Sequence, residues 1–120
     1  MKRQYRLRRP AHFQRVRSHG NLHEDARLSI SVAPARQRTT RCGIVVARRH
    51  GGAVTRNRIK RRVREAIRLQ YQYIRGNVDI VFIARSRSLL LTPFPKLLEL
   101  IATLLRRAGV YITPEVASTQ

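Results

Sequence analysis

The segment of residues 56–74 constrains this chain most, because it contains neither glycine nor proline and its apolar residues recur at helical spacing. When each residue is advanced by ~100°, the apolar side chains that share one face are Ile59, Val63, Ala66, Ile67 and Ile74. Thr55 suits an N-cap before the segment, and Gly76 suits a stop after it. The pattern predicts one long amphipathic helix that lies on a hydrophobic core.

A cationic ridge adjoins the apolar face of this predicted helix. Its members cluster between about 100° and 200° around the helix axis, and they are Asn57, Lys60, Arg61, Arg64 and Arg68. Like charges four residues apart, such as Arg64 and Arg68, repel each other. Glu65 is the only acid in the segment. The unrelieved repulsion favours a phosphate-binding surface over the alternative, a solvated helix face.

Three other segments predict strands. Residues 27–32 alternate apolar and polar side chains, which indicates a half-buried strand with one polar face. Residues 42–47 are apolar on both faces, and residues 78–84 are rich in residues that favour strands. Because a basic loop joins the first two strands, we expect them to form an antiparallel hairpin.

Two further helices complete the predicted order. Residues 10–19 place Phe13 and Val16 on one face, and Gly20 with Asn21 ends this helix. A last helix with a leucine-rich face opens at residues 92–93 and ends at Gly109.

The predicted element order is α-β-β-α-β-α. It indicates an α+β fold in which helices pack on a small central sheet. A chain of this length is most simply one domain, which we place over residues 1–120. We expect its core to span about 7–109 and residues 110–120 to form a flexible tail.

The charge balance narrows the class of partner. Of the 120 residues, 26 are Lys or Arg and only 6 are Asp or Glu, which gives a net charge of +20. This excess argues against a free-standing enzyme for small molecules and points to a polyanion. Most of the basic residues are arginine, whose planar fork grips phosphate with two hydrogen bonds.

Several other classes of site and location do not fit the sequence. The single cysteine, Cys42, excludes an intrachain disulfide and a thiolate metal cluster. The histidines lack zinc-ligand spacing, and the six acids are scattered, so we predict neither a protein-borne catalytic site nor a metal site. No stretch approaches the ~20 apolar residues of a membrane span, and the basic N-terminus lacks the apolar stretch of a secretory signal. We therefore expect a cytoplasmic location.

Residues 51–65, with Arg-Asn-Arg at 56–58, closely resemble the signature of the bacterial ribonuclease P protein subunit. Residues 42–49 resemble the strand and basic pair that precede that signature, and residues 78–85 resemble the strand that follows it. The opening segment and the last helix are also similar to those of the family, so the resemblance covers about 7–109.

The resemblance implies a function, partners and a fold. The family's protein is the non-catalytic subunit of a ribonucleoprotein endonuclease that removes the 5′ leader from precursor tRNA. It binds ribonuclease P RNA and the leader, and it assists substrate and metal binding, while the RNA and its Mg²⁺ ions carry the chemistry. One protein per RNA is expected, with neither DNA nor a membrane as partner. The implied fold is that of the second domain of a small-subunit ribosomal protein, with a left-handed crossover.

The resemblance also implies site residues. Those expected to contact the catalytic RNA are Arg56, Asn57, Arg58, Lys60, Arg61, Arg64 and Arg68. Those expected at the leader are Phe13, Arg17, Ser31, Arg48 and Arg49. Arg17 and Ser31 stand where the family commonly has aromatic residues, Gly52 replaces an Asn, and Ala47 replaces a Ser. On an ideal helix, Arg56 projects nearer the apolar side than the ridge does. A structural role therefore suits Arg56 as well as an RNA contact does.

Two rival functions fit part of the pattern. A structural RNA-binding protein, such as a ribosomal component, would carry the same charge. A stand-alone nuclease would need the scattered acids to cluster in space. Phe13 also has a plain alternative, a core contact of the first helix.

Overall fold

The structure, a computed structural model, describes residues 2–112 and contains a four-stranded sheet. Its strands are β1 (Asn21–His23), β2 (Leu28–Pro34), β3 (Arg41–Val46) and β4 (Val78–Ala84), in the order β1-β2-β4-β3. β4 pairs antiparallel with β2 and parallel with β3. Every residue of β4 is buried, as expected for a strand with a neighbour on each side and helices on both faces.

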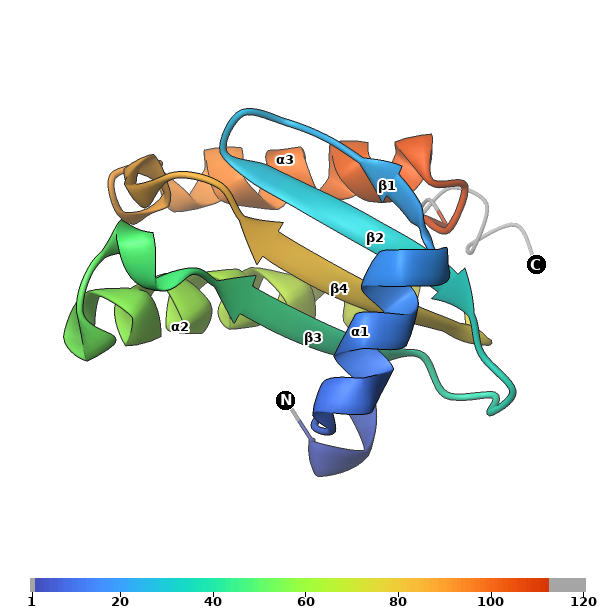
Figure 1. The fold of residues 1–120 in the computed structure, drawn as a ribbon. Coiled ribbons are helices and arrows are strands. Elements are labelled where there is room, and N and C mark those ends of the chain that lie inside the picture. The colour runs from blue at the N-terminus through green and yellow to red at the C-terminus, as the bar shows by residue number, and fades with distance from the viewer. Residues whose placement is uncertain (1, 113–120) are drawn as a thin grey trace.

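Helices cover both faces of this sheet (Figure 1). α1 (Pro10–His19) crosses one face, and α2 (Ala53–Gln70) and α3 (Phe94–Arg107) lie on the other. The side chains of β4 alternate accordingly, because Ile80 and Phe82 join the core under α2 and α3, whereas Val81 and Ile83 join the smaller core under α1. The predicted α+β class is confirmed.

The connection from β3 through α2 to β4 is left-handed. In Figure 1, β3 and β4 run in the same direction, α2 lies behind the sheet, and β4 lies above β3. Seen from the side of α2 with the strands pointing up, β4 therefore lies to the left of β3. About 98% of such connections are right-handed, so the hand is a distinctive feature of the fold, and it agrees with the family resemblance.

The predicted hairpin of the first two long strands is wrong. β4 lies between β2 and β3, because only a central position buries both faces and both edges of this apolar strand. The polar face predicted for β2 is also buried, with Ser29 and Ser31 each 1% exposed. The short β1 was not predicted, since three residues after a helix carry almost no periodicity.

The central helix is shifted relative to its predicted span of 56–74. It begins after the N-cap Gly52 and ends at Gln70, and a short 3₁₀ helix (Tyr71–Tyr73) follows. Thr55 thus lies within the first turn and is not the N-cap. Gly76 is not the stop, since the chain has already left the helix.

The predicted end of α3 is confirmed. Gly109 has a φ of 73°, the left-handed conformation that commonly ends a helix. Beyond it, Val110 is buried and Tyr111 forms a bridge with Ile74. The domain therefore extends past the predicted limit at Gly109, and residues 113–120 of the predicted tail lie outside the described residues.

Candidate nucleic-acid interface

α2 divides into a buried stripe and an outward-facing cationic ridge. Its buried residues are Ile59, Val63, Ala66, Ile67 and Gln70. The residues on the adjoining side are all exposed or half-buried, and we call them the α2 ridge: Asn57, Lys60, Arg61, Arg64 and Arg68. The predicted separation of the two faces is confirmed.

The α2 ridge continues onto the N-terminal segment. A 3₁₀ helix (Arg3–Tyr5) leads to Arg6, which forms a parallel bridge with Cys42 in β3. Burial lowers the pKa of Arg64, and the charges of Arg6 and Arg61 lower it further. Arg6 therefore lies close enough to the ridge to share its electrostatic field.

Glu65 relieves part of the repulsion at the C-terminal end of the ridge. Arg68 donates from Nε to the Glu65 carboxylate at 3.0 Å, and both side chains are about half exposed. This hydrogen bond raises the pKa of Arg68 and lowers that of Glu65. An exposed pair adds little stability, so its main effect is to orient the Arg68 guanidinium.

The remaining arginines of α2 occupy different environments. Arg58 is exposed. Arg56 is half-buried, and its Nε has no hydrogen-bond partner among the described residues. Arg62 donates to the Thr92 carbonyl just before α3, so it links the two helices. Arg56 thus lies nearer the core than the α2 ridge does, as its position on the ideal helix indicated.

The turn between β3 and α2 carries Arg48 and Arg49. Both are exposed on a short 3₁₀ helix that directly follows β3. Gly51 then adopts a φ of 133°, and a Cβ there would lie 2.9 Å from the Thr55 Cβ. Only glycine makes this turn without strain. The turn therefore fixes how the two arginines sit relative to the start of α2.

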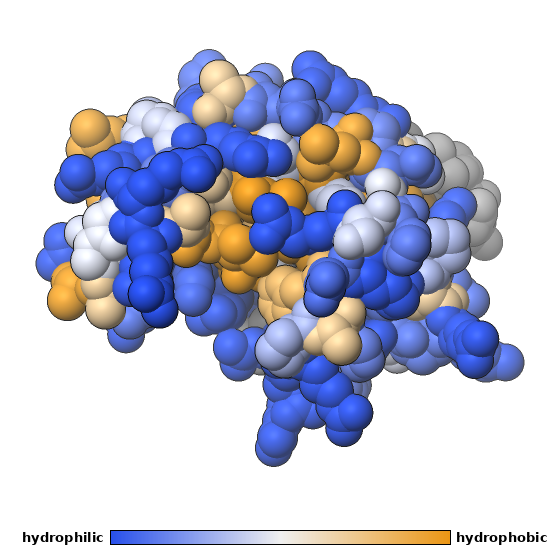
Figure 2. All heavy atoms as spheres, in the orientation of Figure 1, coloured by the Kyte–Doolittle hydropathy of each residue, from blue (hydrophilic) through white to orange (hydrophobic). Residues whose placement is uncertain are grey.

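A groove lies between α1 and the sheet. We call it the α1 groove, and its lining residues are Pro10, Phe13, Gln14, Arg17, Ser18 and Val45. The Phe13 ring packs against Gly43, where a Cβ would come within 2.4 Å of it. Figure 2 shows hydrophobic residues gathered beside α1 on this face, surrounded by hydrophilic ones. Phe13 is partly buried and packs on the smaller core under α1, as its plain alternative expects, and Arg17 lines the same groove.

Ser31 does not belong to this groove. It is 1% exposed, and its hydroxyl donates to the Val16 carbonyl at 2.8 Å under α1. The expected contact of Ser31 with the leader stays a prediction, and the structure shows its hydroxyl holding α1 on β2. Arg48 and Arg49 are not among the groove's lining residues either, although they follow the strand that supplies Val45.

Asp79 anchors α1 across the sheet, a role that the sequence did not reveal. Its carboxylate is fully buried and accepts hydrogen bonds from Arg15 of α1, from Arg41 of β3 at 2.9 and 3.1 Å, and from Gln37 at 3.0 Å. A single acid within an apolar strand was the available signal, because such a residue needs a cationic partner.

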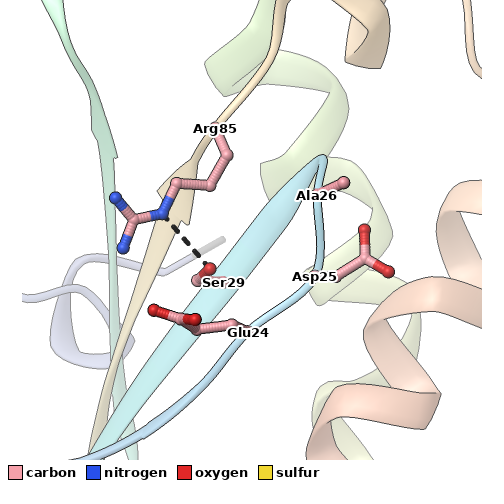
Figure 3. A pocket seen from close by; sticks show the side chains of 5 residues that line it. All are labelled: Glu24, Asp25, Ala26, Ser29 and Arg85. Atoms are coloured by element: carbon pink, nitrogen blue, oxygen red, sulfur yellow. Dashed lines mark hydrogen bonds between the residues drawn. The ribbon is translucent and has the colours of Figure 1, made fainter.

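A hollow at the β1–β2 turn contains acidic side chains, unlike the cationic α2 ridge. It is lined by Glu24, Asp25, Ala26, Ser29 and Arg85 (Figure 3). Arg85 donates from Nε to the Ser29 hydroxyl at 3.2 Å, and the Glu24 and Asp25 side chains point to opposite sides of the connection. Two neighbouring acids make this hollow unsuitable for phosphate, so the cationic surfaces on α1 and α2 are the better candidates.

Neither a metal-binding cluster nor a membrane span occurs in the described part of the chain. Within residues 2–112, no three or more His, Cys, Asp and Glu side chains group so as to hold a metal ion. Over the same residues, no helix combines the length and the hydropathy needed to cross a bilayer.

Comparisons with known proteins agree with one another. The family model "Ribonuclease P" matches residues 1–109. The ribonuclease P protein component of Roseiflexus castenholzii is 54% identical over 110 residues, covering 92% of this chain and 90% of the relative. That of Chloroflexus aurantiacus is 49% identical over 114 residues, covering 95% and 84%.

Solved structures give the same result. The RNase P protein of Staphylococcus aureus superimposes with a TM-score of 0.78 at 28% identity, covering 89% of this chain and 97% of that protein. The RNase P protein of Thermotoga maritima gives a TM-score of 0.76 at 30% identity, covering 85% and 96%.

Proposed function

Because the chain belongs to the ribonuclease P protein family, which acts in the 5′ processing of tRNA, we propose that it is the RNA-binding subunit of this ribonucleoprotein endonuclease. The observation that carries the proposal is the placement of two RNA-compatible surfaces on opposite faces of one sheet, the α2 ridge and the α1 groove. One protein can then hold a catalytic RNA and a substrate at the same time.

The α2 ridge is the proposed contact with ribonuclease P RNA. Its cations repel one another in the free protein, and phosphates in their midst would replace that repulsion with attraction. Each phosphate contact also releases counterions, which drives binding at low salt. The buried stripe of α2 supplies the rigid support, because the helix cannot turn its ridge away without exposing Ile59 and Val63.

The α1 groove is the proposed contact with the precursor tRNA leader. An unpaired base can stack on the Phe13 ring or on the Arg17 guanidinium, and stacking tolerates any base. This tolerance suits leaders of varied sequence. The exposed Arg48 and Arg49 would then meet leader phosphates beyond the end of β3.

We assign Mg²⁺ mainly to the RNA subunit, because within residues 2–112 no three His, Cys, Asp or Glu side chains group so as to hold an ion. Mg²⁺ prefers carboxylate and water oxygens in octahedral geometry. The Asp79 carboxylate is occupied by Arg15 and Arg41, and that of Glu65 is occupied by Arg68. The protein would assist metal binding indirectly, by holding the two RNAs in place.

The proposal is tested by cleavage of precursor tRNA at low Mg²⁺ with a bacterial ribonuclease P RNA, with and without the protein. We expect faster cleavage with the protein, and a larger effect for a long leader than for a leader of one nucleotide. Cleavage no faster than with RNA alone would refute the function. A gain independent of leader length would leave only a structural RNA-binding role.

The α2 ridge is tested with Arg61→Ala combined with Arg64→Ala. We expect weaker binding to the catalytic RNA and a log–log salt slope flatter by roughly 1.4–1.8, with stability changed by no more than about 0.5 kcal/mol. Arg36→Ala with Arg38→Ala removes the same charge from an exposed loop and is the matched control. Equal loss of affinity in both pairs would mean that binding follows net charge and not the ridge.

A further inference from the structure

An aromatic hollow lies where the N-terminal segment meets the C-terminal end of α2. It is lined by Lys2, Tyr5, Arg68 and Tyr71. The rings of Tyr5 and Tyr71 have centroids 4.6 Å apart and are tilted by 30°, so they form a close aromatic pair. Both tyrosines are half-buried, and Lys2 and Arg68 are exposed.

Both rings are held in place by contacts outside the hollow. The Tyr71 hydroxyl donates to the Thr40 carbonyl, and burial raises its pKa above its ordinary value. Tyr5 belongs to the segment that the Leu7 N–H ties to the Cys42 carbonyl at 2.9 Å. The aromatic surface is therefore preformed, and a ligand would lose little affinity to ordering it.

The charge around the hollow selects an anionic aromatic ligand. Arg68 belongs to the α2 ridge and is oriented by Glu65, whereas Lys2 brings a second cation from the N-terminal segment. The field of Arg6 couples this segment to Arg64 of the ridge. A nucleotide matches this arrangement, because its base can stack on the tyrosine pair while its phosphate meets the cations.

We propose that the Tyr5–Tyr71 hollow binds one unpaired nucleotide of the RNA held by the α2 ridge, with its base stacked on the tyrosine pair. The proposal rests on the proposed binding of ribonuclease P RNA and adds a base contact to a surface otherwise made of phosphate contacts. The nucleotide is unpaired because bases within an A-form helix do not present their faces. It belongs to the catalytic RNA because Arg68 of the α2 ridge lines the hollow, whereas α1 lies on the other face of the sheet.

The test measures the affinity of a bacterial ribonuclease P RNA for the wild type, Tyr5→Phe, Tyr5→Leu and Tyr111→Leu over a series of salt concentrations. Tyr5→Leu keeps apolar packing on Tyr71 but removes the aromatic face. Tyr111 is the matched control, since it pairs with Tyr73 at 6.1 Å and has Arg106 4.7 Å above its ring. Circular dichroism verifies that each variant is folded.

We expect Tyr5→Leu to weaken binding about 5- to 150-fold with an unchanged salt slope, because a stacked base releases no counterion. Tyr5→Phe should bind within about twofold of the wild type, because it keeps a stacking face. Tyr111→Leu should do the same, because Tyr111 does not line the hollow. A Tyr5→Leu variant that binds like the wild type would overturn the proposal. So would a weakened variant with a flatter slope, since the ring would then merely position Lys2 and Arg6. If the wild type itself does not bind this RNA, the proposed function fails first.

Discussion

Asp79→Asn should loosen the attachment of α1 to the sheet while leaving the rest of the fold intact, because Val16 and the Ser31 hydroxyl still hold the helix. The native carboxylate is fully buried and binds Arg15 of α1, Arg41 of β3 and Gln37 of the loop between β2 and β3. The substituted amide would retain the shape of the side chain and lose its charge. Two guanidinium groups would then face each other without the anion that holds them.

The expected loss of unfolding free energy depends on how far the two arginine partners of Asp79 are exposed to solvent. Breaking a buried ion pair costs about 3–5 kcal/mol when the orphaned charge stays buried. The side chains of Arg15 and Arg41 are 37% and 24% exposed, so water recovers part of their solvation and the loss should fall near the lower limit. With an unfolding entropy of about 2.1 cal/mol/K per residue, a loss of about 3 kcal/mol lowers Tm by about 12 °C.

The assays are thermal melting and leader-dependent cleavage, the latter well below the Tm of the variant. We expect the variant to discriminate less between long and short leaders, since α1 supplies Phe13 and Arg17. Binding of the catalytic RNA should be unchanged, because the apolar stripe of α2 does not involve Asp79. Glu65→Gln, which breaks an exposed pair, is the control and should melt close to the wild type. A Tm shift for Asp79→Asn below about 3 °C, or equal loss of both RNA-binding activities, would refute the reasoning.

Two further outcomes are expected. Gly51→Ala should lower the free energy of unfolding in urea by about 1–3 kcal/mol, because φ is 133° and the new Cβ would crowd Thr55. Gly52→Ala is the control and should be tolerated, since its Cβ would meet no atom within 4 Å. Equal stabilities of the two variants would contradict this reasoning. Burial, and secondarily the charge of Asp79, raises the pKa of Cys42 to about 12. The folded state therefore favours the neutral thiol, and this contribution to stability is complete below the unfolded pKa of about 8.5 and is lost as the pH rises toward 12. Iodoacetamide at pH 8.5 should label Cys42 rapidly only in denaturant, and equally fast labelling of the native protein would show that the thiol is accessible.

The central helix and its two faces could be predicted from residue spacing alone. The positions of Ile59, Val63 and Ile67 predicted the buried stripe, and the same rotation predicted the α2 ridge beside it. This succeeded because helical periodicity is local, so residues three and four apart share a face whatever lies across from them. The Gly109 stop was equally local, since a left-handed residue ends a helix without reference to the rest of the chain.

The strand order and the composition of the α1 groove depend instead on long-range packing. Periodicity predicted that one face of β2 would be buried, but it could not reveal that α1 covers the other face and removes Ser31 from solvent. Nor could it place β4 between β2 and β3, because pairing depends on the burial of whole edges rather than on neighbouring residues.

The contacts that build the two surfaces join distant parts of the chain. Asp79 lies 64 positions from Arg15 and 38 from Arg41, and Tyr5 meets Tyr71 across most of the domain. The acid in the apolar strand β4 indicated that Asp79 needs a cationic partner, but nothing local indicated which one. Local residue spacing therefore determines which side of each helix or strand is apolar and which is cationic. The tertiary fold determines which of these sides pack together, because only the packed chain brings such distant side chains within reach of one another.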